Sequence, residues 1–417
     1  KYNRVIGSYK NGAYDTLPIA GQSLQLTIDE ELQAYGELLM QHKRGSIVAI
    51  EPKTGEILTL VSSPSYDPNL LVGRKRSENY NILYNDSLAK PLFDRALLAE
   101  YPPGSTFKAL TGLIGLEEQV MTPQSLVSCA GGYHYGSRVM KCHAHSSPTD
   151  MLHAIATSCN AYFAHEYRKI VEKYPTPALG IDAWNNHLKS FGLGQFLGSD
   201  FPIGRKGYVP DSKFYNRQYG ENRWGATYNI SNGIGQGEVL VTPLQLANVM
   251  AAIANKGYYY TPHIVKKIDE KVTPFTEYTT PKHTTIEEKY FAPVIQGMNL
   301  AYTDGTARGT KIDSINIAAK TGTAENYTRI NGVRMKLTDH SIFVAFAPIE
   351  DPKIVVAVFV ENGSFGARIA GPVTSLIIEK YLKGEVYRCD FERQMLEKSL
   401  EHEYLKPYLG QKFYINQ

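Results

Sequence analysis

The sequence has no uninterrupted run of apolar residues that is long enough to cross a membrane. A transmembrane helix needs about 18 such residues. The best candidate, Ile342 to Val360, is interrupted by Glu350-Asp-Pro-Lys353. We therefore expect no transmembrane helix within the chain. The chain begins with Lys1 and has no signal-like segment, so we expect an upstream portion of the protein to precede it.

A large excess of either charge is also missing. The 417 residues include 44 Lys and Arg and 41 Asp and Glu, which gives a net charge of +3. A charge this small creates no strong field that would attract nucleic acid, and we expect no nucleic-acid partner. The hydrophobic content of 43% is sufficient for a large core. We predict one large domain with smaller segments at its ends.

Cysteine is scarce, but three of the four cysteines lie in one part of the chain. Cys129, Cys142 and Cys159 are separated by short segments, and two histidines follow Cys142 closely. This spacing is compatible with a tetrahedral zinc site of three cysteines and one histidine. We prefer His145 to His143 as the fourth ligand, because two residues separate it from Cys142.

The same cysteines allow two other interpretations. Cys129 and Cys142 could form a disulfide in an oxidising compartment, or all three thiols could be free and buried. A metal at Cys159 would connect the loop to Ser158 and Asn160, which flank it. Cys389 lies outside the cluster and is expected to be unpaired.

One stretch, Tyr101-Pro-Pro-Gly-Ser-Thr-Phe-Lys108, places a serine and a lysine three residues apart. Proline and glycine break the chain at 102–104, and the apolar residues that follow predict a helix beginning at Ser105. The spacing places the Lys108 amine beside the Ser105 hydroxyl on one helix face. A lysine can activate a serine only if burial or a second cation lowers its pKa. Taken alone, the pair also fits an N-cap serine and a solvated lysine.

Two further motifs follow in the chain. Ser158-Cys-Asn160 interrupts a helical pattern, and Lys320-Thr-Gly-Thr323 follows the apolar run Ile315 to Ala319. S-x-x-K, S-x-N and K-T-G in this order resemble the motifs of penicillin-recognising serine transferases. Gly233-Ile-Gly-Gln-Gly-Glu238 and Thr242-Pro-Leu-Gln-Leu246 look like the segment that such proteins have before K-T-G. The chain resembles class B penicillin-binding proteins, and among them the elongation-type penicillin-binding protein 2 group.

The resemblance and the chemistry of the side chains together imply a role for each motif residue. Ser105 attacks the substrate, unprotonated Lys108 accepts its proton, and the charge of Lys320 lowers the pKa of Lys108. Ser158 relays a proton to the leaving amine, while Asn160 holds Lys108 and binds a substrate amide.

The K-T-G segment is implied to bind the substrate. By resemblance, the backbone N–H groups of Ser105 and Thr323 form the oxyanion hole. Thr321, Thr323 and Lys320 bind a substrate carboxylate. Gly322 is small because the substrate lies against that strand.

The family implies a peptidoglycan D,D-transpeptidase. The D-Ala-D-Ala end of a stem peptide acylates Ser105, and an amine of a neighbouring stem resolves the acyl-enzyme into a crosslink. β-Lactams would acylate the same serine. Class A β-lactamases have a deacylating glutamate in an E-x-x-L-N segment between S-x-N and K-T-G, and this chain has no convincing counterpart. Glu166 stands in His165-Glu-Tyr-Arg168, which is not followed by Leu-Asn. Slow hydrolysis of the acyl-enzyme is therefore expected.

The resemblance also implies partners and a location. Some relatives have a zinc site in the corresponding loop, with the cysteine of S-x-N as a ligand. We expect a structural Zn²⁺, no organic cofactor, a glycan polymerase as partner, and an N-terminal helix outside this chain that anchors it at the periplasmic face of the inner membrane.

Two alternatives remain open. The first is a class D-type β-lactamase or antibiotic-sensing domain, against which the chain length and the S-x-N motif argue. The second is a catalytically silent scaffold that binds cell-wall partners, which the presence of all motif residues disfavours.

The predicted fold is α+β, with a mostly antiparallel central sheet, helices on both faces, and the serine β-lactamase-like topology of the family. We expect an arm or a remnant of a preceding domain at 1–44, the transpeptidase domain at 45–383 and a C-terminal appendage at 384–417. The active site should lie at the sheet edge formed by the Lys320-Thr-Gly strand.

The β-rich runs 45–51 and 55–61 predict a hairpin joined by the turn 52–55, and the runs 317–320, 341–347 and 354–361 predict three further strands. The apolar stretch 242–255 predicts a helix with Thr242 as its cap and Pro243 at its first position.

Three other parts of the chain carry weaker patterns. Residues 63–99 are predicted to be a polar loop, and residues 174–227 have few long periodic runs. Near the C-terminus, Leu396, Leu400 and Tyr404 recur at helical spacing.

Overall fold

The computed structural model describes residues 9–13, 20–269, 271–272, 276–330 and 332–408. Parts of the two predicted terminal segments, residues 1–8, 14–19 and 409–417, lie outside these ranges. Within the described ranges, no helix has the length and the apolar character that a membrane crossing requires.

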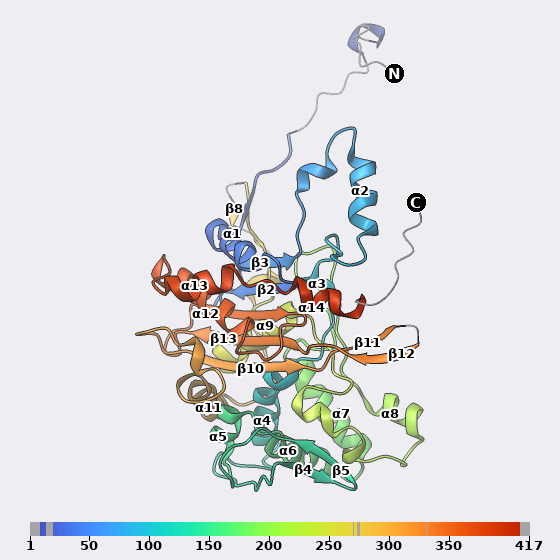
Figure 1. The fold of residues 1–417 in the computed structure, drawn as a ribbon, viewed down its shortest axis with the longest axis vertical. Coiled ribbons are helices and arrows are strands. Elements are labelled where there is room, and N and C mark those ends of the chain that lie inside the picture. Colours follow the sequence, from blue (N-terminus) through green and yellow to red (C-terminus); the bar gives the residue numbers. More distant parts are fainter. Residues whose placement is uncertain (1–8, 14–19, 270, 273–275, 331, 409–417) are drawn as a thin grey trace.

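A five-stranded antiparallel sheet forms the centre of the molecule, in the order β10-β13-β14-β2-β3 (Figure 1). Its strands are β2 (Gly45–Ile50), β3 (Ile57–Ser63), β10 (Ala318–Ala324), β13 (His340–Ala347) and β14 (Ile354–Val360). The predicted hairpin of β2 and β3 and the three predicted C-terminal strands are confirmed. β10, which contains the K-T-G motif, is an edge strand, as the sequence predicted.

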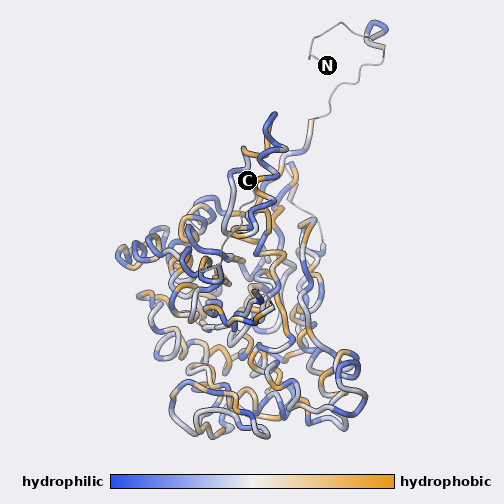
Figure 2. Tube along the Cα trace, turned by 45° about the vertical axis from the view of Figure 1, so that its right-hand side comes forward, coloured by the Kyte–Doolittle hydropathy of each residue, from blue (hydrophilic) through white to orange (hydrophobic). Residues whose placement is uncertain are grey.

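The central strands are apolar at nearly every position because both faces of the sheet are covered. Successive side chains of a strand point to opposite faces. In β14, Val355, Ala357 and Phe359 pack with helices on one side, while Val356 and Val358 pack on the other. Hydrophobic residues are therefore distributed along many elements of the body rather than gathered in one long run (Figure 2). The predicted α+β architecture with helices on both faces is confirmed.

Helices cover the two faces of the sheet. On one face lie α1 (Glu30–Leu39) and α12 (Ala370–Lys383); on the other lie α4 (Lys108–Glu117), α6 (Asn160–Glu172) and α9 (Pro243–Ala254). The predicted start of α9 is confirmed: Thr242 and Gln245 form a capping box, and Pro243 takes the first position.

The other elements surround this core. They are β1 (Leu24–Leu26), α2 (Arg76–Asn85), α3 (Arg95–Leu98), β4 (Gly132–Tyr135), β5 (Arg138–Lys141), α5 (Met151–Thr157), α7 (Pro177–Ser190), α8 (Ser212–Tyr219), β6 (Tyr258–Tyr259), β7 (Val265–Ile268), β8 (Lys271–Val272), α10 (Thr276–Thr279), β9 (Lys282–His283), α11 (Phe291–Thr303), β11 (Tyr327–Ile330), β12 (Val333–Lys336), α13 (Cys389–Leu396) and α14 (Glu401–Leu405). β4 and β5 form a hairpin beside α6 (Figure 1).

Two segments contain helices that the sequence did not reveal. The predicted loop 63–99 includes α2 and α3, and the stretch 174–227 includes α7 and α8. α2 buries none of its residues, so it lacks the apolar periodicity that identifies a helix. α7 had a local signal, because Thr176 caps it and Pro177 takes its first position.

The C-terminal residues at helical spacing lie in two helices and the connection between them. α13 ends at Leu396 and α14 begins at Glu401, so Leu400 lies in the connection between them. Leu400 and Tyr404 are nevertheless buried against the same cluster as α1 and α12. Their spacing reflects contact with a common surface rather than a continuous helix.

A buried ion pair attaches this C-terminal region to α12. The Arg388 guanidinium lies 2.7 Å from the Glu379 carboxylate, whose side chain is 1% exposed. The same guanidinium donates to the Ser375 hydroxyl at 3.2 Å and to the Lys311 carbonyl at 3.0 Å. Removal of Arg388 would leave a buried carboxylate without its cation.

We predict that Arg388→Met lowers the free energy of unfolding by about 3 kcal/mol, because breaking one side of a buried pair leaves an uncompensated charge. Urea unfolding monitored by circular dichroism measures the change. Arg393→Met is the matched control, since its pair with Asp390 is 67% and 83% exposed and should contribute little. Equal stability losses in the two variants would contradict the prediction.

Candidate active site

A cleft of about 890 Å³ opens where the edge of β10 meets the turn before α4 and the junction of α5 and α6. Six of the predicted site residues line it: Ser105, Ser158, Asn160, Thr321, Gly322 and Thr323. The two predicted lysines, Lys108 and Lys320, are fully buried. Three motifs that are far apart in the sequence are thus brought together.

The nucleophile candidate lies on a tight turn rather than in the α-helix itself. Residues Gly104–Phe107 form a 3₁₀ turn, and α4 begins only at Lys108, whose N–H donates to the carbonyl of Ser105. The prediction of a helix starting at Ser105 is therefore wrong by one turn. The turn still places Ser105 one turn before Lys108, which preserves their shared face.

Lys108 is held by the S-x-N motif. Its Nζ donates to the Ser158 carbonyl at 2.7 Å, to Ser158 Oγ at 3.1 Å and to Asn160 Oδ1 at 2.5 Å. Burial lowers the pKa of Lys108 to about 7. A lysine with this pKa is substantially unprotonated at neutral pH, which a proton acceptor requires.

The two lysines influence each other differently from the sequence-based expectation. Burial, rather than the charge of Lys320, is the leading cause of the lowered pKa of Lys108. The pKa of Lys320 is itself well below its usual range, first through burial and then through the positive charge of Lys108. Lys320 Nζ donates to the Thr321 carbonyl at 3.2 Å.

Ser158 has an unusual backbone conformation that explains the S-x-N geometry. It caps the C-terminus of α5 with φ 59° and ψ 43°, a left-handed conformation that is uncommon for residues other than glycine. This bend turns the Ser158 carbonyl and side chain toward Lys108. Asn160 then begins α6, and its Nδ2 donates to the Lys141 carbonyl at 2.7 Å.

The outer edge of β10 presents backbone groups to the cleft. The N–H and C=O of one residue point to the same side of a strand, and the sides alternate along it. The Thr323 carbonyl accepts from Gln236 Nε2 at 3.0 Å, so it faces away from β13. The Thr323 N–H must face the same way, as an oxyanion donor would.

Gly322 has a structural reason to be glycine besides the predicted contact with substrate. A Cβ at this position would lie 2.9 Å from Thr106 Cγ2 and 3.2 Å from the Pro103 carbonyl oxygen. The turn Gly104–Phe107, called the nucleophile turn below because it contains Ser105, therefore packs directly on β10.

The residues that line the cleft without having been predicted to do so include His143, Gln236, Thr306 and Phe365. Thr306 Oγ1 accepts from Thr321 Oγ1 at 2.8 Å, and no sequence motif marked it. The rings of His143 and Phe365 meet with their centroids 6.0 Å apart. Gln236 lies in the Gly233–Glu238 segment, whose resemblance to the family was the available signal.

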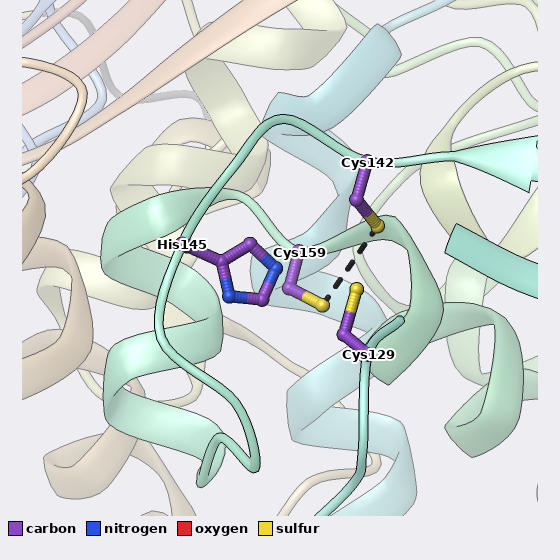
Figure 3. A group of neighbouring side chains, drawn as sticks. All are labelled: Cys129, Cys142, His145 and Cys159. Atoms are coloured by element: carbon purple, nitrogen blue, oxygen red, sulfur yellow. Dashed lines mark hydrogen bonds between the residues drawn. The ribbon is translucent and has the colours of Figure 1, made fainter. Parts of the chain in front are cut away.

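The predicted metal ligands form one cluster beside this cleft. One potential ligand atom from each of Cys129, Cys142, His145 and Cys159 lies within 4.8 Å of the others (Figure 3). The sulfurs of Cys142 and Cys159 are 4.0 Å apart, and all four cysteines of the chain are free thiols, so no Cys129–Cys142 disulfide is formed. His143 is directed instead toward Phe365.

The donor set fits a tetrahedral zinc ion. His145 Nδ1 lies 2.7 Å from the Ser146 carbonyl, which makes it the protonated nitrogen and leaves Nε2 as an acceptor. Nε2 is buried and has no hydrogen-bond partner in the described part of the chain. Two N–H groups at the start of α6 donate to sulfur: Ala161 to Cys142 at 3.2 Å and Tyr162 to Cys159 at 3.3 Å.

These contacts stabilise a thiolate. Hydrogen bonds from the Cys159 thiol and the Ala161 N–H lower the pKa of Cys142 to about 4. Burial raises the pKa of Cys129, and the hydrogen bond with Cys142 raises that of Cys159, so a bound cation would have to displace the protons of these two thiols.

The chain is similar to known proteins over most of its length. Residues 45–379 match the model of the penicillin-binding protein transpeptidase domain. The peptidoglycan D,D-transpeptidase MrdA of Acinetobacter baumannii is 34% identical over 374 residues, which cover 85% of this chain and 54% of that protein. The chain therefore spans about half the length of this curated relative.

Solved structures share the fold. Penicillin-binding protein 2 of Pseudomonas aeruginosa, in complex with WCK 5153, has a TM-score of 0.75 at 34% identity, over 89% of this chain and 82% of that chain. Penicillin-binding protein A of Mycobacterium tuberculosis, as a ceftriaxone acyl-enzyme, has a TM-score of 0.69 at 29% identity, over 87% and 80%. With the family model matching residues 45–379, the chain belongs to the penicillin-binding protein transpeptidase family.

Proposed function

We propose that this chain is the catalytic part of an elongation-type peptidoglycan D,D-transpeptidase that forms an acyl-enzyme at Ser105. The observation that supports the proposal most strongly is the set of three hydrogen bonds from Lys108 Nζ to Ser158 and Asn160. They hold a buried lysine of lowered pKa, and Ser105, one turn before it in the chain, lines the cleft. This is the pairing of nucleophile and base that acyl transfer requires.

In the first half of the reaction, Lys108 takes the proton of Ser105 as its oxygen attacks the carbonyl of the penultimate D-Ala. The bond from this carbonyl to the terminal D-Ala breaks, and an ester to Ser105 forms. Ser158 Oγ, 3.1 Å from Lys108 Nζ, relays the proton to the departing amine. Terminal D-Ala leaves as an amine, so atoms and charge balance.

In the second half, an amine of a neighbouring stem peptide attacks the ester. A new amide bond forms, the ester bond breaks, and the proton that the attacking amine loses passes through Lys108 to Ser105. The N–H groups of Ser105 and Thr323 stabilise the oxyanion in both halves. The hydroxyls of Thr321 and Thr323 with the Lys320 amine bind the substrate carboxylate, and Asn160 contributes to amide binding.

Water should compete poorly with the amine. Glu166, which follows the S-x-N motif on α6, is fully buried and does not line the cleft. A Cβ on Gly115 of α4 would lie 2.1 Å from its Oε1, so its carboxyl group packs against α4. Glu166 is therefore not placed to activate water in the cleft.

Names of relatives support the wider assignment. MrdA relatives are named as peptidoglycan D,D-transpeptidases. Penicillin-binding protein 2 of Helicobacter pylori, 27% identical, has been solved in complex with MreC. We extend this to a chain that works at the periplasmic face of the inner membrane, held by an N-terminal anchor and paired with a glycan polymerase.

A structural Zn²⁺ belongs to the same proposal. Cys129, Cys142, His145 and Cys159 would hold the ion with four protein ligands, which leaves no position for substrate or water. When bound, the ion supplies no chemistry beyond fixing these ligands. Cys159 lies between Ser158 and Asn160, so the ion would restrain the turn that holds Lys108.

The proposal is tested by acylation with fluorescent penicillin. We expect one covalent adduct per chain, located on Ser105 by peptide mapping, and none in Ser105→Ala. Ser125→Ala, a serine outside the cleft, is the control and should be labelled normally. An adduct that persists in Ser105→Ala would refute the assignment. Repeated turnover of a chromogenic cephalosporin would indicate a β-lactamase, and absence of labelling a silent scaffold.

Lys108→Met should reduce the rate of acylation by about 10³-fold, because it removes the base and keeps a side chain of similar length. Stopped-flow measurement of the acylation rate tests this. Lys173→Met is the control: Lys173 pairs with Glu118 outside the cleft, so its loss should leave the rate unchanged. Acylation of Lys108→Met at the normal rate would assign the base to another group.

Protein purified without chelators should contain one zinc ion per chain by elemental analysis. Cys142→Ser should lose the ion, acylate more slowly and unfold at lower temperature, because metal binding contributes to folding. Cys389→Ser, an exposed cysteine outside the cluster, should keep the ion and the rate. Metal-free protein with a Cys129–Cys142 disulfide would show that these cysteines have another role.

A further inference from the structure

Three backbone segments meet at one corner of the cleft. The N–H of Gly104, which precedes Ser105, donates to the Gly235 carbonyl at 2.8 Å. A Cβ on Gly104 would lie 2.5 Å from the Thr323 carbonyl oxygen, and a Cβ on Gly235 would lie 2.2 Å from the Gly104 oxygen. The nucleophile turn, the η5 turn (Ile230–Ile234) with the residues after it, and β10 are therefore in direct backbone contact.

One side chain links the η5 turn to β10. Gln236 Nε2 donates to the Thr323 carbonyl at 3.0 Å, and the Gln236 N–H donates to the Ser231 carbonyl at 3.0 Å. The backbone hydrogen bond fixes the position of the Gln236 main chain, and the hydrogen bond of the side-chain amide fixes the far end of the side chain. Within the part of the chain that the structure describes, no other hydrogen bond of the Gln236 side chain is found.

These contacts form a closed triangle. Its corners are Gly104, the residues after the η5 turn, and Thr323. Gly104 donates a hydrogen bond to Gly235 and packs against Thr323, and Gln236 donates to the Thr323 carbonyl. The two backbone donors proposed for the oxyanion hole, at Ser105 and Thr323, stand on two corners of this triangle. Their separation depends on all three sides.

β10 needs such a tie at this end. As an edge strand it is paired on one side only, so Thr323 has no neighbouring strand on its cleft side. Because the carbonyl and N–H of Thr323 face the same side, a donor that holds the carbonyl also sets the direction of the N–H. Oxyanion donors act well only when their positions are set before the reaction.

We infer that Gln236 is a positioning residue for the oxyanion hole: its amide holds the Thr323 backbone so that the Thr323 N–H points at the developing oxyanion. Gln236 itself does not touch the reacting atoms. The inference rests on the proposed acyl transfer at Ser105 and adds to it a residue whose side chain acts through β10.

The experiment separates the strength of binding from the rate of acylation. For the wild-type chain and for Gln236→Ala and Gln236→Met, stopped-flow measurements with benzylpenicillin give the dissociation constant of the initial complex and the rate constant of acylation. We expect both variants to acylate about 10- to 100-fold more slowly with little change in the dissociation constant, because misplacing an oxyanion donor affects mainly the transition state.

An acylaminomethyl boronic acid supplies a second readout. Its boron bonds to Ser105 Oγ and becomes tetrahedral, which places an oxygen where the oxyanion forms. Its affinity for the Gln236 variants should fall by about the same factor as the acylation rate. A purely structural defect would instead reduce the fraction of active protein and leave the rate constant of that fraction unchanged.

One control variant and three possible outcomes decide the test. Gln195→Ala, an exposed glutamine outside the cleft, should behave as wild type. If Gln236→Met acylates normally, side-chain bulk rather than the amide is sufficient, and the inference is wrong. It is also wrong if the wild type is acylated and both variants keep its rate and boronate affinity. If the wild-type chain is not acylated at all, the proposed function itself fails.

Discussion

The burial of the Lys108 amine is the constraint on which the site depends. A lysine removed from water needs acceptors for its N–H groups, and this chain supplies the carbonyl and hydroxyl of Ser158 and the amide oxygen of Asn160. These acceptors can converge only because Ser158 adopts a left-handed conformation between α5 and α6. The strained residue, the helix break and the lowered pKa are therefore consequences of one requirement: a buried base beside a serine.

This requirement extends outward to the cysteine cluster. Asn160 accepts from Lys108 with its oxygen and donates to the Lys141 carbonyl with its nitrogen, and Lys141 precedes Cys142. The N–H groups at the start of α6 that point at Cys142 and Cys159 belong to the same helix turn. The Lys108 amine, the S-x-N turn and two of the four potential metal ligands, Cys142 and Cys159, are thus linked by hydrogen bonds at the start of α6.

Sequence patterns predicted those features that depend on local chemistry. The apolar strands, the capped helix α9 and the motif residues were visible because alternation, capping and turn residues act over a few positions. α2 was not visible, since a helix that buries nothing has no periodicity. The division of Leu396, Leu400 and Tyr404 between two elements was hidden because contact with α1 and α12 set their spacing. The place of Thr306 in the cleft could not be predicted, because only tertiary packing brings its hydroxyl to 2.8 Å from that of Thr321.

The pKa values of the two lysines also could not be predicted from the sequence alone. The sequence suggested that Lys320 would lower the pKa of Lys108, because two cations near one serine repel each other. In the folded chain both amines are fully buried, and burial is the larger effect on each. Lys108 has three acceptors nearby, whereas Lys320 donates to one backbone carbonyl. When Lys108 is charged, its positive charge further disfavours a proton on Lys320. Substrate carboxylate bound at the K-T-G strand would reverse that bias, because an anion beside Lys320 stabilises its charged form.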